Sequence, residues 1–235
     1  LGRVANDSHG KHYTEDMQNC GVGFSGPGSD EQGTGTCVVL ITPDTERTML
    51  THLGVSSSLH PENVDETIVK NSRGVYVEGY LWTGDGTREA GQHMAGIAKK
   101  EGIPVSFTLS DAFVVNSFKE SLIEFIDSYV DILFCNEVEA QAMTGESDSL
   151  SAFKKLQATV DTVFLTLGSK GSLVGKSGQE PVEVNTFPVK AVDTTGAGDL
   201  FAAGALYGVL KNHSLEESAI IGSYCAAQVV SHIGG

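Results

Sequence analysis

Basic residues are scarce in this chain. Its 235 residues include 15 Lys and Arg against 30 Asp and Glu, which gives a formal net charge of -15 at pH 7. Long-range electrostatics would repel a phosphate backbone from such a chain. We therefore expect no nucleic acid among its partners.

Cysteines and long apolar runs are also few. Cys20, Cys37, Cys135 and Cys225 are scattered, and neither a CxxC pair nor a His/Cys cluster has metal-ligand spacing. No apolar run approaches the roughly 20 residues that cross a bilayer, and no signal-peptide pattern opens the chain. These absences favour a cytoplasmic protein with reduced thiols and no membrane partner.

Two glycine-containing stretches match nucleotide-binding motifs only superficially. Gly21–Gly26 spells G-x-G-x-x-G, but Pro27 and Gly28 follow where a dinucleotide site needs a helix. In Lys170–Ser177 the two glycines are one residue too close for a Walker A loop, and the pattern predicts a hairpin instead. HExxH and GxSxG are absent, so the sequence does not favour a zinc or serine hydrolase.

From about residue 75 onward, β-rich runs alternate with amphipathic helical stretches. The expected strands include VYVEGYLW, PVSFTLS, VDILFCN and DTVFLTLG, and the expected helices between them include TREAGQHMAGIAKKEG, SFKESLIEFIDSY and SLSAFKKLQAT. This alternation is typical of βα units around a mostly parallel sheet. We therefore predict an α/β body.

The first part of the chain has a different pattern. TGTCVVLITPDTERTMLTHL contains two extended runs around a turn at Pro43 and Asp44, which predicts a β-hairpin without a helix after each strand. We expect a partial β lid with flanking segments over residues 1–57 and a nucleotide-binding α/β body over residues 58–235.

The stretch AVDTTGAGDLFAAGAL, which follows two further predicted strands, contains a glycine turn before a helix. The turn leaves the N–H groups of Gly196, Ala197 and Gly198 free, and we expect the helix from about Gly198 to Lys211. A helix N-terminus carries roughly half a positive charge and unpaired donors, so it can bind a phosphate. Asp199 in the first turn can accept a proton from a hydroxyl; the alternative is a plain loop with a helix-stabilising acid.

A last helix is predicted from Ser214 to His232, because Ser214 and Glu217 have the spacing of a capping box.

AVDTTGAGDLFAAGAL resembles the C-terminal signature of the ribokinase-like (PfkB) family of sugar and nucleoside kinases, and matches its D-T-x-G-A-G-D core at every position. The resemblance extends over nearly all of the chain. It implies a three-layer α/β/α fold, ATP as the phosphoryl donor and Mg²⁺ as a cofactor. It also implies Asp199 as catalytic base, Gly196–Gly198 as an anion hole, and a monovalent cation, K⁺, near Asp193 and the carbonyl of Thr195.

VDILFCNEVEA resembles the N-x-x-E segment of this family. The resemblance implies that Asn136 and Glu139 support the magnesium ion and its waters. The same two residues have the spacing of a capping box for the following helix, and both roles are compatible.

Two further segments resemble the nucleotide site of the family. TLGSKG resembles its nucleotide-binding turn, which assigns Thr166, Gly168 and Gly171 to ATP; an ordinary hairpin is the alternative. The segment after Ser223, with Ala227 and His232, lies where relatives form the adenine pocket.

The lid segment and SFTLSDAFVVNSFKESLIEFIDSYVDILF resemble adenosine kinases more than ribokinases or fructokinases. This resemblance places Thr36 and Cys37 on the lid over the acceptor, Arg47 near the phosphates and Phe113 near the purine. The alternatives are a core position for Phe113 and a solvated hairpin charge for Arg47.

The family begins with a strand that carries an acceptor-binding Asp, followed by a paired-glycine motif, and neither precedes Leu1. We therefore expect that the first strand or strands and the final tail are missing. The favoured prediction is an ATP-dependent kinase that phosphorylates a hydroxymethyl group of a nucleoside, adenosine first. A sugar kinase of the fructokinase or ribokinase kind and a non-catalytic nucleotide-binding protein are the alternatives, and both monomer and homodimer stay open.

Overall fold

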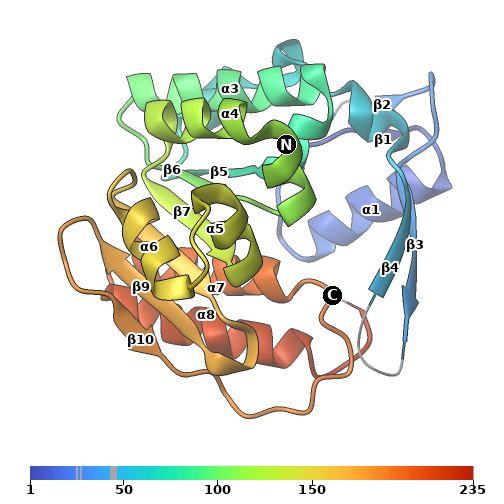
Figure 1. Cartoon of the computed structure of the whole chain (residues 1–235). Helices are drawn as coiled ribbons and strands as arrows, with labels where there is room; N and C mark the ends of the chain where they lie inside the picture. The colour runs from blue at the N-terminus through green and yellow to red at the C-terminus, as the bar shows by residue number, and fades with distance from the viewer. Residues whose placement is uncertain (25, 27, 43–46, 235) are drawn as a thin grey trace.

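A six-stranded sheet lies at the centre of the computed structural model, which describes residues 1–24, 26, 28–42 and 47–234 (Figure 1). Its strands in chain order are β5 (Val75–Glu78), β6 (Val105–Thr108), β7 (Ile132–Asn136), β8 (Thr162–Thr166), β9 (Ser172–Lys176) and β10 (Val182–Val184). Strands β5 to β8 pair in parallel, and β9 and β10 extend the sheet beyond β8 in antiparallel pairing. The mostly parallel sheet predicted from the alternating pattern is confirmed.

Helices cover both faces of this sheet (Figure 1). One face carries α3 (Asp85–Lys100), α4 (Ala112–Tyr129), α5 (Glu137–Thr144) and α6 (Ser149–Gln157), and the other carries α7 (Ala197–Leu210) and α8 (Leu215–Val229). Successive strand residues point to opposite faces, so Leu133 packs in the first of these cores and Phe134 in the second. The expected three layers of helix, sheet and helix are confirmed.

Close packing between α7 and α8 holds the N-terminus of α7 in place. A Cβ atom added at Gly204 would lie 2.9 Å from Cα of Gly222, and one added at Gly208 would lie 2.7 Å from Cα of Ser218. The two helices can approach this closely only because glycines lie at these positions. The end of α7 that follows the glycine turn is therefore supported by a rigid pair of helices.

The predicted limits of these two helices are nearly correct. α7 begins at Ala197, one residue before the predicted Gly198. The capping box of α8 is confirmed, because Oγ of Ser214 accepts the N–H of Glu217 at 3.1 Å and the Glu217 carboxylate accepts the N–H of Ser214 at 2.8 Å. α8 ends before the predicted His232, which lies in a bend after the helix.

The predicted hairpin is present as β3 (Thr36–Ile41) and β4 (Arg47–His52), which pair antiparallel. These strands form a sheet of their own, apart from the central sheet. In Figure 1 they stand beside the body, at the edge where the C-terminus of the chain also lies. The predicted turn, Pro43 and Asp44, lies outside the described residues, and the division into residues 1–57 and 58–235 stays a prediction.

Helix α1 (Ser8–Asn19) was not among the predicted elements and lies in the segment before the hairpin. The helix begins after Asp7, whose Oδ1 accepts the N–H of Gly10 at 2.8 Å. Its Oδ2 accepts the N–H of Thr34 at 2.8 Å, which ties the helix to the segment before the lid. Gly10 is its only buried residue, so α1 lacks the buried apolar stripe of helices such as α3 and α6.

The remaining described elements are short: β1 (Val4–Ala5) paired in parallel with β2 (Gly28–Ser29), α2 (Glu66–Lys70), and 3-10 helices over Gly54–Ser58, Pro61–Asn63, Gly79–Thr83 and Gly168–Lys170. Lys170–Ser177 contains β9 and is a hairpin strand as predicted, not a phosphate loop. No helix within the described ranges is long and apolar enough to cross a membrane.

Candidate active site

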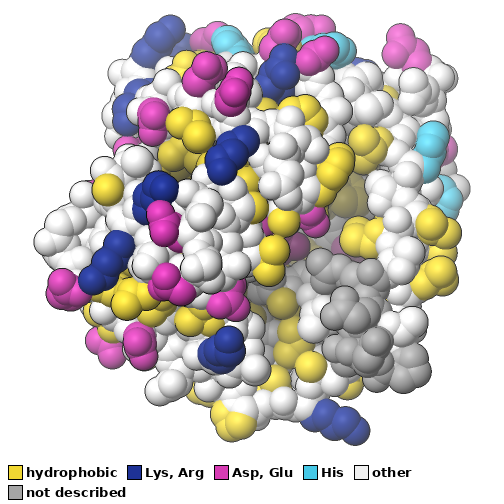
Figure 2. Space-filling view, in the orientation of Figure 1, with side chains coloured by type: hydrophobic (Ala, Val, Ile, Leu, Met, Phe, Trp, Pro, Cys, Tyr) yellow, Lys and Arg dark blue, Asp and Glu magenta, His cyan; other side chains and the backbone are white. Residues whose placement is uncertain are grey.

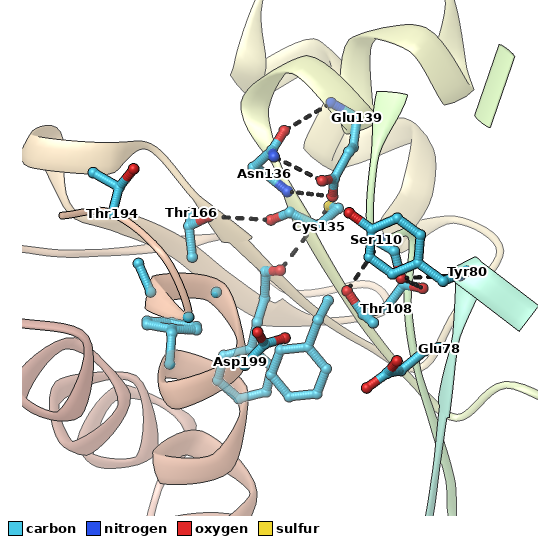
Figure 3. Close-up of a pocket in the computed structure, with 16 residues that line it drawn as sticks. Glu78, Tyr80, Thr108, Ser110, Cys135, Asn136, Glu139, Thr166, Thr194 and Asp199 are labelled. Atoms are coloured by element: carbon cyan, nitrogen blue, oxygen red, sulfur yellow. Dashed lines mark hydrogen bonds between the residues drawn. The ribbon is translucent and has the colours of Figure 1, made fainter. Parts of the chain in front are cut away.

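The carboxyl ends of the parallel strands meet at one edge of the sheet, where open α/β folds commonly bind ligands. Glu78, Thr108, Asn136 and Thr166 end β5, β6, β7 and β8, and all four line a cavity of about 230 Å³ (Figure 3). We call it the central cavity. Residues 196–199, at the start of α7, line it as well.

The turn before α7 leaves backbone N–H groups unpaired. Gly196 caps the helix with a φ of 76°, a left-handed conformation that favours glycine. Among the described residues, the N–H groups of Gly196 and Gly198 have no protein acceptor, whereas the N–H of Ala197 donates to the carbonyl of Thr194 at 3.3 Å. The expectation of three free donors is therefore corrected to two, and Ala197 contributes as a lining residue.

The space in front of Gly198 is open. A Cβ atom added at Gly198 would meet no heavy atom within 4 Å, in contrast to the crowded Gly204 and Gly208 further along α7. Helix packing explains the later glycines but does not require one at residue 198. A helix N-terminus with free N–H groups and open space before it fits a phosphate group.

Asp199 is the third residue of α7, and its side chain points into the central cavity, as does that of Glu78 (Figure 3). Burial, and the negative charge of Asp199, raise the pKa of Glu78. Asp199 itself is exposed, so a hydroxyl group bound in the cavity can reach its carboxylate. This arrangement suits Asp199 to proton transfer.

Asn136 and Glu139 form the predicted capping box at the start of α5. Oδ1 of Asn136 accepts the N–H of Glu139 at 2.9 Å, and the Glu139 carboxylate accepts the N–H and Nδ2 of Asn136 at 2.9 and 2.7 Å. Glu139 is 4% exposed, and burial raises its pKa to about 7, against the lowering effect of the Asn136 N–H. A nearby cation would favour the ionised form of this carboxyl.

A second cavity, of about 380 Å³, adjoins the first, and we call it the flanking cavity. The structure brings four residues predicted to bind the nucleotide together in its lining: Thr166, Gly168, Gly171 and Ala227. Both cavities are lined by Thr166, Thr194, Ala197, Gly198 and Phe201. The N-terminus of α7 therefore lies at the junction of the two cavities.

The turn over Gly168–Lys170 has a backbone that depends on glycine. Gly168 and Gly171 have φ values of 58° and 97°, and a Cβ atom on Gly171 would overlap the carbonyl oxygen of Val184. At Gly168 and Gly171 the backbone itself therefore lines the flanking cavity, with no side chain in between.

Four other residues that were predicted to bind the nucleotide or the acceptor line neither cavity. Phe113 is 65% exposed at the start of α4, Thr36 and Cys37 are exposed on β3, and His232 is exposed after α8. Arg47 begins β4, but its side chain lies outside the described residues. Their roles toward the acceptor, the phosphates and the adenine stay predictions.

Asp193 holds the loop that precedes the glycine turn. It is 2% exposed, and its carboxylate accepts the N–H and Oγ1–H of Thr195 at 2.9 and 2.7 Å and the N–H of Gly234 at 3.0 Å. These bonds join the loop to the end of the chain. A monovalent cation near Asp193 and the carbonyl of Thr195 stays a prediction.

Polar residues that no motif indicated also line the central cavity. Glu78 ends β5 and Tyr80 lies two residues beyond it, and Thr108 ends β6 with Ser110 two residues beyond. Ser110 has a φ of 68°, an uncommon conformation for a residue other than glycine. All four lie inside the predicted strands VYVEGYLW and PVSFTLS, so the sequence did not mark them as residues at the edge of the sheet.

Aromatic rings form an apolar part of the same lining. Phe134 and Phe164 stack with centroids 5.0 Å apart, and Phe201 meets Phe164 edge-on at 6.3 Å. Phe201 also lines the flanking cavity, so an apolar surface continues from one cavity to the other.

The fold and this site define a class of protein. An open α/β sheet, a glycine turn at a helix N-terminus and a carboxylate in the first turn of that helix are the parts of a phosphoryl-transfer site. The model of the pfkB family carbohydrate kinase matches residues 1–235, and the chain belongs to this family of phosphotransferases, which act on alcohol groups.

Individual relatives are similar over the whole chain. The structure of adenosine kinase from Sinorhizobium meliloti has a TM-score of 0.96 and 36% identity, and the match covers 100% of this chain and 72% of that one. A probable sugar kinase from Rhizobium etli CFN 42 has a TM-score of 0.96 and 35% identity with the same coverage. Adenosine kinase from Saccharomyces cerevisiae is 28% identical over 250 residues, which is 100% of this chain and 72% of the yeast protein. The predicted family and its ribokinase-like fold are confirmed.

Proposed function

We propose that the protein transfers the γ-phosphoryl group of ATP to a hydroxymethyl oxygen of a nucleoside, with adenosine as the favoured acceptor. The start of α7 carries this proposal, because Gly196 and Gly198, with free N–H groups, and Asp199 all line the central cavity, and Gly198 lines the flanking cavity as well. The similarity to two adenosine kinases supports adenosine.

The two cavities divide the substrates between them. The flanking cavity, with apolar walls that include Phe187, Pro188 and Val189, receives the adenosine part of ATP. The triphosphate then extends along the turn at Gly168 toward the start of α7. The acceptor occupies the central cavity, with its hydroxymethyl group toward Asp199.

Transfer needs one proton acceptor and a site for negative charge. Asp199 takes the proton of the acceptor hydroxyl as its oxygen attacks the γ-phosphorus. The bond from the γ-phosphorus to the bridging oxygen breaks, and ADP leaves with that oxygen. The N–H groups of Gly196 and Gly198 stabilise the charge on the transferred group.

Asn136 and Glu139 fit a magnesium ion held through water. The described residues contain no group of three or more His, Cys, Asp or Glu side chains that could hold a metal ion alone. Magnesium usually keeps several waters and is bound by few carboxylates together with substrate phosphates. The buried Glu139 carboxylate can accept hydrogen bonds from such waters. When bound, the ion neutralises charge on the β- and γ-phosphates.

Glu139→Gln is expected to raise the Mg²⁺ concentration for half-maximal turnover by about 10-fold or more. This is the usual effect of losing a residue that hydrogen-bonds to the groups bound to a metal. The pH dependence of stability should change as well. The pKa of Glu139 is raised from 4.5 to about 7 in the folded state, so its ionisation lowers wild-type stability as the pH rises through this range. Denaturant unfolding without magnesium should show the variant gaining stability relative to wild type between these pH values.

Glu217→Gln is the matched control, because Glu217 completes the same kind of capping box with Ser214, outside both cavities. Hydrogen bonds from Ser214 lower the pKa of Glu217, so the stability that its ionised form contributes is lost as the pH falls. This pH dependence is opposite in sign to that of Glu139. The magnesium requirement should not change. A wild-type magnesium requirement in Glu139→Gln would contradict the metal role.

The acceptor is tested by comparing adenosine with ribose, which is the same sugar without the base. Stacking of a base on aromatic side chains contributes about 1 to 3 kcal/mol, so kcat/KM for adenosine should exceed that for ribose by about 10-fold or more. A coupled assay of ATP turnover with adenosine, inosine, ribose and fructose measures this. Turnover with fructose and none with adenosine would instead favour the sugar kinase, the second candidate, which the similarity to the Rhizobium etli protein supports.

A further inference from the structure

Within the part of the chain that the structure describes, which leaves out the side chain of Arg47, no basic residue lines either cavity, although the proposed donor is a polyanion. The central cavity carries three acidic residues, Glu78, Glu139 and Asp199. Acidic groups are visible within the hollow of the molecule in Figure 2, and the basic side chains of this view lie on the outer surface. Magnesium and the start of α7 would therefore have to attract the triphosphate against a chain of net charge -15.

Lys170 is a described basic residue whose neighbours in the chain line one of the cavities. Gly168, Ser169 and Gly171, its neighbours in the turn, all line the flanking cavity. Its ammonium group lies 4.0 Å from Oε2 of Glu137, the residue after Asn136, and Asn136 lines the central cavity. The ammonium group thus lies beside the first residue of α5, next to the segment proposed for magnesium, on a turn that lines the cavity proposed for adenosine.

The ion pair with Glu137 is easily broken. The side chain of Lys170 is 74% exposed, and exposed pairs at such distances contribute little to stability. Glu137 does not need the lysine, because its other carboxylate oxygen accepts a hydrogen bond from Ser149. Lys170 can therefore leave Glu137 without exposing an unpaired buried charge.

We propose that Lys170 exchanges Glu137 for the β- or γ-phosphate of the nucleotide when ATP binds, and so acts as a positioning residue for the donor. This inference rests on the proposed function. Lys170 serves as a mobile point charge on a flexible stem, the usual way in which lysine binds phosphate. Glu137 holds the ammonium group at the start of α5 until the nucleotide arrives.

The experiment compares nucleotide binding to wild type, Lys170→Met and Lys170→Arg by calorimetry. Lys170→Met should weaken the binding of ATP and ADP by about 5- to 10-fold, the scale of one exposed charged hydrogen bond, and change adenosine binding less than about 2-fold. Lys170→Arg should stay within about 2-fold of wild type because the charge is kept. In turnover assays the loss should appear in KM for ATP rather than in kcat.

Glu137→Gln tests the exchange itself. Removing the competing carboxylate should tighten ATP binding by about 2-fold when Lys170 is present. In the Lys170→Met background the same change should leave the affinity for ATP unaltered. Gln at this position can still accept the hydrogen bond from Ser149.

Lys176→Met is the matched control. Lys176 lies at the other end of β9 and forms a similar exposed pair, 3.9 Å from Asp161, away from both cavities. Its loss should leave ATP binding unchanged. Equal ATP affinity in Lys170→Met, Lys176→Met and wild type would overturn the role of Lys170 while the kinase proposal stands. No ATP binding to folded wild type would overturn the proposed function and this inference with it.

Discussion

Asp199→Asn is expected to lower kcat by about 100- to 10,000-fold, the usual contribution of general acid–base catalysis, with little change in the Kd for ATP. The amide has nearly the volume of the carboxylate and can stay at the third position of α7. It cannot accept the proton of the acceptor hydroxyl. Steady-state kinetics and calorimetric titration with ATP measure the two quantities separately.

Two controls separate catalysis from the effect of charge near a helix N-terminus. Glu216→Gln removes an exposed acid from the first turn of α8, outside both cavities, and should leave kcat within about 2-fold of wild type because the dipole interaction it loses is small. Glu78→Gln removes another carboxylate that lines the central cavity, and should reduce kcat less than Asp199→Asn. A folded Asp199→Asn protein that turns over within a few-fold of wild type would contradict the assignment of Asp199 as base.

The parts of the site that could be predicted come from residues close together in the sequence. The glycine turn and Asp199 lie within four consecutive residues, so their spacing alone indicates a helix N-terminus with an acid in its first turn. Asn136 and Glu139 are likewise three residues apart at one helix start. Strands β6 to β9 were predictable because they are mostly buried on both faces and therefore appear as short, largely apolar runs.

The parts that could not be predicted depend on contacts between distant residues. Glu78 and Ser110 reach the central cavity only because β5 and β6 pair in parallel and end together. Helix α1 has a polar surface and is identified mainly by its Asp7 cap. Phe113 was placed near the purine by resemblance, but its helix leaves it exposed and outside both cavities.

The backbone hydrogen bonds of the glycine turn could not be predicted from the sequence either. The pattern indicates three free N–H groups, yet the structure pairs Ala197 with Thr194. That bond depends on the left-handed conformation of Gly196, which the residue type permits but does not require.

Gly198→Ala is expected to change stability and activity in opposite directions. Glycine within a helix costs about 0.5 to 1 kcal/mol relative to alanine, and a Cβ atom at Gly198 would meet no protein atom within 4 Å. The free energy of unfolding should therefore rise by a fraction of that amount, because residue 198 lies in the first turn of α7. Alanine keeps the backbone N–H of residue 198, but the added methyl group would hold the transferred phosphoryl group away from it. Losing one such charge-stabilising contact typically lowers kcat about 100- to 1,000-fold.

Gly96→Ala provides the comparison that decides what the glycine at 198 is for. Gly96 lies within α3, outside both cavities, and a Cβ atom there would come no closer than 4.0 Å to Tyr129. Both variants should be at least as stable as wild type in denaturant unfolding. Gly96→Ala should keep wild-type turnover, and Gly198→Ala should lose most of it together with part of its affinity for ATP.

If Gly198→Ala turns over like Gly96→Ala, no phosphoryl group approaches residue 198, and the anion hole must be placed elsewhere. If Gly198→Ala is instead destabilised, the glycine serves the fold of α7, and its open surface is not a binding surface.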